Sequence, residues 1–163
     1  MRFANVTVFL LLLLPIIGCI IGIFCGRAYK KSRMQVRTHK NLKLQVLARD
    51  FTVCKVTDYS GVDFGDKYCF VGKTDEENSL VCETSRVPAN TTEREDGWRA
   101  LRVAGVLDFS LVGILAELSA VLARQNIGIF AVSTYNTDYI FVKRENFSEA
   151  LTRLADGGYT IQN

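Results

Sequence analysis

The C-terminal part of the chain alternates between strand-like and helix-like hydrophobic patterns. The strand-like runs are rich in Val, Ile, Leu and aromatic residues and occupy residues 98–106, 127–133, 139–143 and 159–161. The helix-like patterns, in which apolar residues recur every three to four positions, run from Leu111 to Leu122 and from Asn146 to residue 156. These periodicities predict the order β-α-β-β-α-β.

This order is that of the ferredoxin-like α+β fold. Right-handed crossovers would place both helices on one face of a four-stranded antiparallel sheet, which we expect for residues 98–163. Asp108 or Ser110 is the expected N-cap of the first helix, and Asn126 is expected to end it.

Residues 42–87 contain shorter strand-like runs and no long helical pattern. The runs lie at residues 42–47, 51–56, 67–72 and 79–84. We interpret residues 42–87 as a degenerate first copy of the same unit, with shortened helices. The polar and charged residues 88–97 are predicted to be the linker between two tandem units.

The N-terminal residues form a different kind of segment. Residues 3–26 carry no charge, and as a helix they would be about 36 Å long, enough to cross a bilayer. Basic residues follow at Arg27, Lys30, Lys31 and Arg33. Residues 1–33 are therefore predicted to be a hydrophobic helix with a basic flank, anchoring a cytoplasmic C-terminal domain. The alternatives are a cleaved signal peptide, lipidation at Cys19, or a cytoplasmic protein that starts at Met34.

The charges are divided unevenly along the chain. Residues 1–43 hold eight Lys or Arg and no acidic residue, whereas residues 44–163 hold twelve Lys or Arg against seventeen Asp or Glu, a net charge of −5. An acidic body disfavours nucleic acid as a partner. His39 is the only histidine and lies in a basic run, which argues against a histidine-based triad and a multi-histidine metal site, and no cofactor is expected. No nucleophile–base pair can be assembled, which argues against an enzyme.

The loop before the first helix of the second unit carries the candidate chemistry. Between Leu107 and Gly113 it contains one carboxylate, at Asp108, and one hydroxyl, at Ser110. Amides at the start of a helix attract a carboxylate, and a nearby Asp attracts an ammonium group. This combination suits a zwitterionic amino acid. The alternative is that Asp108 and Ser110 only cap the helix.

Two segments resemble the ACT domain. They are Asp108-Phe109-Ser110-Leu111-Val112-Gly113-Ile114-Leu115-Ala116 and the run from Ile127 to Ile140, which contains Ser133-Thr134-Tyr135-Asn136-Thr137-Asp138. The likeness is greatest to small tandem ACT proteins related to the arginine-sensor proteins of animals and to the regulatory domains of aspartate kinase. Upstream, residues 74–82 resemble the acidic hairpin of the first half of that group, so the resemblance covers residues 42–162.

The resemblance implies a set of ligand-binding residues. ACT domains bind small effectors, mostly amino acids, between paired units. Carried over by position, the ligand's carboxylate end would lie against Leu107, Asp108, Phe109, Ser110, Val112, Gly113 and Ile114. The amino end or side chain would contact Ser133, Thr134 and Asp138. The first half would contribute Ser79, Leu80 and Val81.

Two hypotheses follow for the function. The first is a non-enzymatic regulatory protein that binds an amino acid between ACT units, transmits the signal allosterically, and pairs with a second copy or another ACT protein. The second is a structural protein–protein interaction module that binds no small molecule. A membrane anchor at residues 3–26 is compatible with both.

Overall fold

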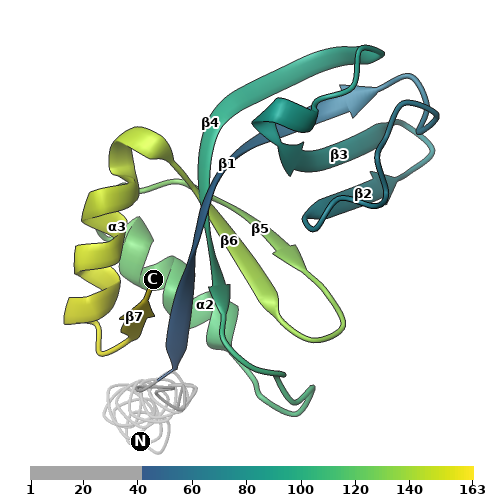
Figure 1. The fold of residues 1–163 in the computed structure, drawn as a ribbon. Coiled ribbons are helices and arrows are strands. Elements are labelled where there is room, and N and C mark those ends of the chain that lie inside the picture. Colours follow the sequence, from purple (N-terminus) through teal and green to yellow (C-terminus); the bar gives the residue numbers. More distant parts are fainter. Residues whose placement is uncertain (1–41) are drawn as a thin grey trace, which may run out of the picture. The chain divides into compact units, whose positions relative to one another are not determined.

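Two long antiparallel strands, β1 (Lys43–Val56) and β4 (Thr91–Val103), form the centre of the structure (Figure 1). The computed structural model describes residues 42–163, so the predicted hydrophobic helix at residues 1–33 lies outside the described residues. The helices that are described are too short or too polar for a membrane crossing.

The remaining elements extend the sheet on both sides of this central pair. They are β2 (Cys69–Lys73), β3 (Asn78–Glu83), η1 (Thr84–Arg86), α2 (Ile114–Ala123), β5 (Ile129–Ser133), β6 (Asp138–Lys143), α3 (Arg144–Asp156) and β7 (Thr160–Gln162). The strand order is β2-β3-β1-β4-β6-β5, with every neighbouring pair antiparallel and β7 beside the start of β1. The element order from β4 to β7 confirms the predicted β-α-β-β-α-β, and the fold is α+β.

The prediction of a separate four-stranded sheet for the second unit is wrong, because β1 lies between β4 and β7. Leu44 of β1 pairs with Val103 of β4 on one side and with Ile161 of β7 on the other. The last strand is therefore parallel to β1 and does not pair with β4. Sequence patterns do not reveal such a pairing, since residues 44 and 161 lie at opposite ends of the described chain.

The predicted linker, residues 88–97, is mostly strand. β4 begins at Thr91, and its first half pairs with β1 alone, while pairing with β6 begins at Trp98. Side chains of residues 92–96 are exposed. Because this part of β4 is an edge strand that faces solvent, its residues are polar, and a polar stretch was interpreted as a linker.

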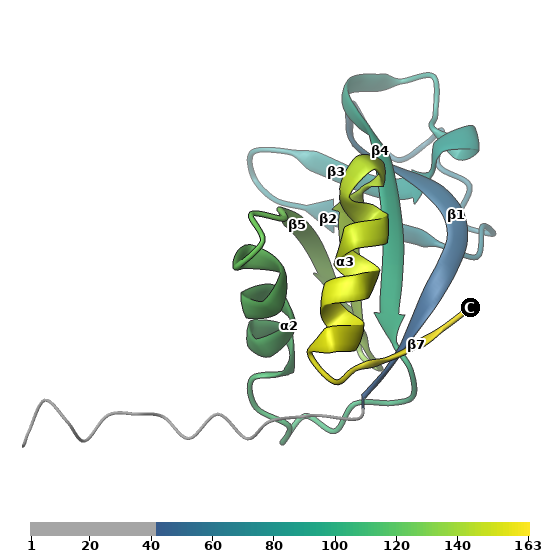
Figure 2. The same cartoon turned by 90° about the vertical axis from the view of Figure 1, so that its left-hand side faces the viewer.

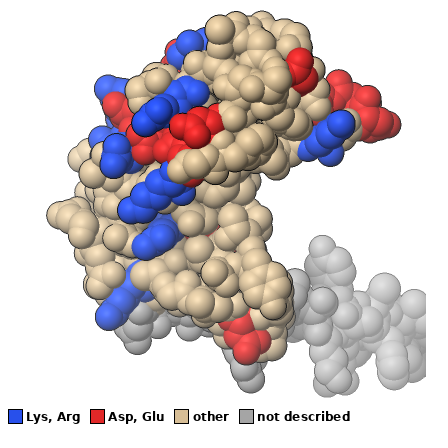
Figure 3. All heavy atoms as spheres, turned by 45° about the vertical axis from the view of Figure 1, so that its right-hand side comes forward, with Lys and Arg blue, Asp and Glu red and all other residues tan. Residues whose placement is uncertain are grey.

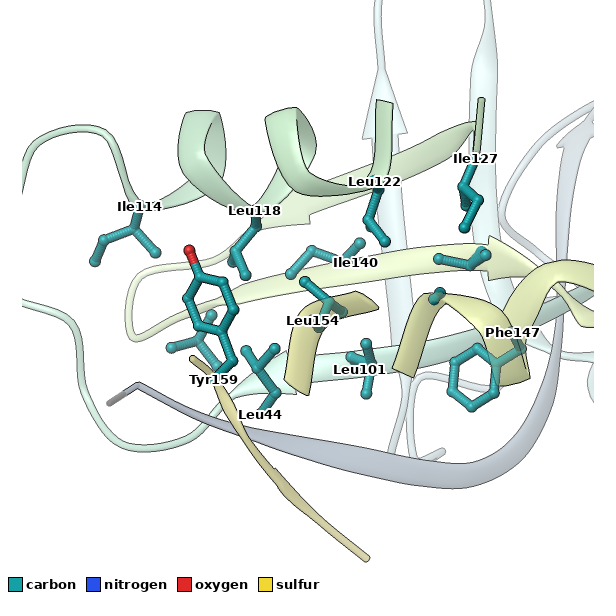
Figure 4. Packing of buried hydrophobic residues seen from close by; sticks show 13 residues of the cluster. Leu44, Leu101, Ile114, Leu118, Leu122, Ile127, Ile140, Phe147, Leu154 and Tyr159 are labelled. Atoms are coloured by element: carbon teal, nitrogen blue, oxygen red, sulfur yellow. The ribbon is translucent and has the colours of Figure 1, made fainter. Parts of the chain in front are cut away.

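The two helices cover one face of the sheet at the β4–β6–β5 end (Figure 2). α2 buries Ile114, Leu118 and Leu122 at four-residue spacing, which is the stripe that a helix turns toward a core. α3 buries Phe147, Ala150 and Leu154. Figure 4 shows these side chains meeting Leu44, Leu101 and Ile140 of the sheet to form the main hydrophobic core.

The opposite face of the sheet holds a second, aromatic core. Neighbouring residues of a strand point to opposite faces, so Ile140 belongs to the helix-side core and Phe141 to this one. The Phe141 ring makes an edge-on contact with Phe51 of β1, with 5.3 Å between centroids, and the Phe70 and Tyr139 rings are 4.8 Å apart. The β2–β3 and β5–β6 hairpins thus pack against each other through the inner face of a curled sheet.

The strand pairing has an internal two-fold pattern. The pair Leu44–Val103 becomes the pair Thr91–Val56 when each residue is exchanged for the one 47 positions away, and Phe51–Trp98 maps onto itself. Between them the register is offset by one residue, since Gln45 pairs with Arg102 and Lys55 pairs with Glu93. The two hairpins correspond at a spacing of 60 residues, since Lys73 pairs with Asn78 and Ser133 pairs with Asp138. β3 and β6 also have the same burial pattern. The two halves therefore have matching strands around a shared central pair.

The first half lacks the helices of the second. Residues 57–68 form an irregular segment where α2 would be expected, and η1 stands in place of α3. The segment covers a small core that includes Cys54 and Cys82, both buried free thiols. Burial raises the pKa of the Cys82 thiol to about 12 and also raises the pKa of Cys54, so both are protonated at neutral pH.

Candidate functional site

A pocket of about 430 Å³ lies where the loop after β4, the first turn of α2 and the β5–β6 turn meet. Its lining residues are Leu107, Asp108, Phe109, Leu111, Gly113, Ile114, Leu115, Ala116, Ser133, Thr134, Tyr135, Asn136, Thr137 and Asp138. The volume lies in the range of small-molecule sites. Asp108 and Asp138 are the only charged residues in this set.

Gly113 shapes the helix side of the pocket. Its φ of 91° is in the left-handed region, which only glycine adopts without strain, and α2 begins directly after it. Gly113 has no side chain with which to cap the helix. The first turn of α2, at Ile114, Leu115 and Ala116, lines the pocket, and backbone amides at a helix start favour an anionic group.

The prediction of Asp108 or Ser110 as the N-cap of α2 is wrong, because they lie five and three positions before Gly113, which holds the N-cap position. Asp108 instead stabilises its own loop. Its Oδ1 accepts a hydrogen bond of 2.7 Å from the Ser110 backbone amide. This bond, together with one from the Ser110 hydroxyl, lowers the pKa of Asp108. The carboxylate is therefore negatively charged at neutral pH.

The β5–β6 turn forms the opposite side of the pocket. The Ser133 hydroxyl donates to Asp138 Oδ1 at 2.6 Å across the last pair of the hairpin. The Thr134 amide and hydroxyl each donate to the Thr137 carbonyl at 2.9 Å. These bonds fix the conformation of the turn. Within the hairpin, they use only the Oδ1 atom of the Asp138 carboxylate.

Two hydrogen bonds hold the loop and the turn together. The Leu107 amide donates to the Asn136 carbonyl at 2.8 Å. The buried Thr137 hydroxyl donates to the carbonyl of Val103, the last residue of β4, at 2.6 Å. Because these bonds join the two sides at the floor, the pocket is a built feature of the fold.

The structure brings together eight of the thirteen predicted site residues. Those that line the pocket are Leu107, Asp108, Phe109, Gly113, Ile114, Ser133, Thr134 and Asp138. Ser110 and Val112 belong to the same loop but not to the lining. Some lining residues, such as Asn136 and Thr137, were not predicted from the sequence. They lie in the turn between the predicted residues Thr134 and Asp138, and this position in the chain could have indicated them.

The three predicted residues of the first half lie elsewhere. Ser79, Leu80 and Val81 are on β3, which β1 and β4 separate from β6. Leu80 is buried in the small core of the first half. Ser79 and Val81 line a different hollow of about 340 Å³ that also includes Phe130. Within this chain, these residues do not contribute to the pocket beside α2.

Exposed apolar side chains surround the mouth of the pocket. Val106, Phe109, Leu111, Val112 and Tyr135, which we call the apolar rim, are between 43% and 80% exposed. The Phe109 and Tyr135 rings meet edge-on at 5.3 Å between centroids. Among residues 42–163, Phe64 and Val71 are the other exposed large hydrophobic residues. Most of the exposed apolar surface is therefore at this end of the molecule.

A larger hollow of about 540 Å³ lies beside the bulge of β1. Its charged groups already pair with one another or with neighbours, as in the ion pair of 3.2 Å between Arg49 and Glu83 and the one of 3.0 Å between Arg144 and Asp50. Its size alone therefore does not make it the better site. The described residues contain no cluster of His, Cys, Asp and Glu that could hold a metal ion.

Charges of both signs are mixed over the described surface. Figure 3 shows Lys and Arg next to Asp and Glu over one side of the molecule. The ion pairs of the described residues include Lys143 with Glu95 and Arg94 with Asp96. These ion pairs neutralise part of the positive charge of the described surface.

Comparison with protein families identifies part of the chain. Residues 93–156 match the family model of the ACT domain. No protein with a curated description matches the chain.

Solved structures share the fold over most of the described residues. A structural-genomics protein from Agobacterium tumefaciens is 25% identical with a TM-score of 0.67, covering 75% of this chain and 92% of that one. A protein of unknown function from Vibrio cholerae, described as a possible transport protein, is 21% identical with a TM-score of 0.54, covering 71% and 88%. The aspartate kinase of Clostridium acetobutylicum, described as an allosteric enzyme, is 13% identical with a TM-score of 0.55, covering 78% of this chain and 37% of the kinase.

Proposed function

We propose that this chain, of which residues 93–156 match the ACT-domain family, is a non-enzymatic regulatory protein that binds a free amino acid. The ligand lies in the pocket between the loop that contains Asp108 and the turn that contains Asp138. This placement is the observation that carries the proposal, because two segments that resemble ACT ligand-binding segments line one cavity.

The chemistry of the pocket supports a zwitterionic ligand. Backbone amides at the start of α2 suit an α-carboxylate, and the Asp138 carboxylate, with Asp108 nearby, suits an α-ammonium group. No Lys or Arg lines the pocket, so a dianionic ligand such as a phosphate ester is disfavoured. Phe109 and Tyr135 provide apolar cover for the carbon chain of the ligand.

Regulation follows because the ligand lies between the loop after β4 and the β5–β6 turn. An amino acid that binds both would draw the loop and the turn together and so change the conformation of the domain. In this mechanism, a partner that binds only one of the two conformations is coupled to the ligand, with a coupling free energy of about 1–3 kcal/mol as in typical allosteric proteins. The partner is a second copy of the chain or another ACT protein.

The internal two-fold pattern supports our interpretation of residues 42–87 as a degenerate first ACT-like unit. Its loop repeats a local feature of the second, since Asp58 Oδ1 accepts from the Ser60 amide at 2.8 Å, as Asp108 does from Ser110 at 2.7 Å. In the first half, however, the intervening Tyr59 donates its hydroxyl to the Gly72 carbonyl at 2.9 Å. We infer that Tyr59 closes the first-half site, so that one chain binds one ligand.

A titration with the twenty amino acids tests the proposed function. The full chain is titrated calorimetrically with each of them, and its thermal transition is recorded in parallel. Binding with a stoichiometry near one, together with a raised transition temperature, supports the proposal. The absence of heat and of any thermal shift with all twenty contradicts it.

The apolar rim favours a second candidate function, an interaction module without a small-molecule ligand. Exposed apolar patches mark contact surfaces. In that case Asp138→Asn leaves partner binding unchanged, whereas Val112→Asp abolishes it. In the regulatory protein, by contrast, Asp138→Asn weakens the binding of the amino acid.

We also propose that residues 3–26 anchor the chain in a membrane with residues 42–163 in the cytoplasm. The length of the uncharged segment and the Lys and Arg residues that follow it support this placement. Resistance of the full chain to alkaline extraction from membranes tests it, and complete release contradicts it.

A further inference from the structure

The apolar rim lies at the end of the domain where the chain enters from its N-terminal segment. The Ala104 amide donates to the carbonyl of Lys43, the first residue of β1, at 2.8 Å. Val106 follows two residues later, and the Leu107 amide joins the turn that carries Tyr135. Figure 1 shows the start of β1 and the loop after β4 at the same end.

The chain that leads to this end is basic and follows the apolar segment closely. Residues 27–43 hold seven Lys or Arg and no acidic residue. The sixteen residues from Arg27 to Leu42 span at most about 55 Å when fully extended. An anchor at residues 3–26 would therefore keep the start of β1 within that distance of the bilayer.

We propose that the apolar rim rests on the lipid surface of the membrane that residues 3–26 enter, with its side chains at the boundary between headgroups and acyl chains. The inference rests on the proposed anchor and requires no bound amino acid. The described chain begins at the same end of the domain as the rim.

The residue types of the rim suit this environment. Tyr and Phe side chains favour the membrane interface, and the rim carries one of each beside Val106, Leu111 and Val112. A few apolar side chains bind a bilayer weakly by themselves, but a short tether supplies a high effective concentration, so weak contacts suffice. The basic residues 27–43 add attraction to anionic lipid.

Other occupants of the rim are less well supported by the described residues. If two copies of the chain paired through their rims, both rims would face each other and not the membrane. Folding of residues 3–26 onto the rim would remove the anchor. Both alternatives give distinct results when the rim is probed in vesicles.

Tryptophan probes in vesicles with brominated acyl chains test the contact. Val112→Trp and Val106→Trp place an indole on the rim at positions that are exposed and outside the pocket lining. Phe64→Trp is the matched control, because Phe64 is 63% exposed in the irregular segment of the first half. The wild-type chain, whose only tryptophan is Trp98, gives the background signal.

The full-length variants are reconstituted in vesicles of phosphatidylcholine and phosphatidylserine with and without bromine near the headgroups, and flotation is measured on the same samples. We expect bromine to lower the rim-probe fluorescence at least twofold, and to leave Phe64→Trp and wild type within a tenth of their unbrominated values.

Chains that float with the vesicles but whose rim probes are not quenched overturn the inference and leave the anchor standing. A blue shift of the probes that depends on protein concentration, without quenching, assigns the rim to a second copy and also overturns it. Failure to float overturns both the anchor and the inference. The calorimetric titration with amino acids is unaffected by any of these results.

Discussion

Replacing Asp138 with alanine separates the binding role of this carboxylate from its structural role. Asp138 is the first residue of β6, half-buried, and its Oδ1 accepts the Ser133 hydroxyl at 2.6 Å. The hairpin around it keeps its other bonds, which join Thr134 to Thr137. Alanine therefore removes one side-chain hydrogen bond from the fold and the carboxylate from the pocket.

The two losses differ in size. A single solvent-accessible hydrogen bond contributes about 0.5–1.5 kcal/mol to stability, which corresponds to a few degrees in transition temperature. A hydrogen bond between a carboxylate and a ligand ammonium group contributes about 1.5–3 kcal/mol. At about 1.4 kcal/mol per factor of ten, Asp138→Ala weakens amino-acid binding by roughly 10- to 150-fold.

Calorimetric titration of wild type and variant measures the affinity, and thermal unfolding without ligand measures the stability. Asp138→Asn keeps the size of the side chain and removes its charge, and it is expected to bind nearly as weakly as the alanine variant. Glu76→Ala is the control, since it removes one carboxylate from the turn between β2 and β3. If Asp138→Ala binds as tightly as Glu76→Ala does, the assignment of the ammonium group to Asp138 is refuted.

Four further outcomes are expected. Thr137→Val leaves the buried Val103 carbonyl without its donor, so urea unfolding should show a loss of about 1–3 kcal/mol; an unchanged midpoint contradicts the described floor of the pocket. Phe141→Ala opens a cavity among Phe51, Phe70 and Phe130, at a cost of about 3–5 kcal/mol in the same assay, and a loss below about 1 kcal/mol would show that the aromatic core is not closely packed. Gly113→Ala strains a left-handed position by about 1–2 kcal/mol and lowers the transition temperature, whereas Gly128→Ala, where an added Cβ meets no other atom, serves as its control. Burial raises the pKa of Cys82 in the folded state to about 12. The buried neutral thiol therefore contributes to stability below its ordinary pKa, and this contribution is lost as the pH rises from about 9 toward 12. Native Cys82 should resist alkylation at about pH 8 and react after unfolding.

The sequence predicts elements well where a pattern is local. Apolar residues at four-residue spacing locate α2. The helix ends at Ala123, three residues before the expected Asn126, which has a left-handed φ of 56°. The β5–β6 hairpin and its turn are also where the alternation of residues predicts them. These features depend on neighbours within a few positions of one another, which is why periodicity suffices.

Features that depend on distant partners could not be predicted in this way. The position of β1 between β4 and β7 depends on pairs such as Leu44 with Ile161, which no local pattern encodes. Gly113 was predicted as a pocket residue but not as the residue before the helix, because Asp108 and Ser110 are stronger capping types. Ser79 entered the predicted site through family resemblance, and the strand order places it on another part of the sheet.

The sharing of β1 and β4 has a practical consequence for dissecting this protein. A fragment cut to the matched segment, residues 93–156, would lack the strand that covers one side of β4 and would expose Leu101 and Val103 to water. A fragment ending before residue 91 would lose the strand on which β1 depends in the same way. Neither fragment should fold by itself, and in the intact chain the two halves should melt together in a single cooperative transition.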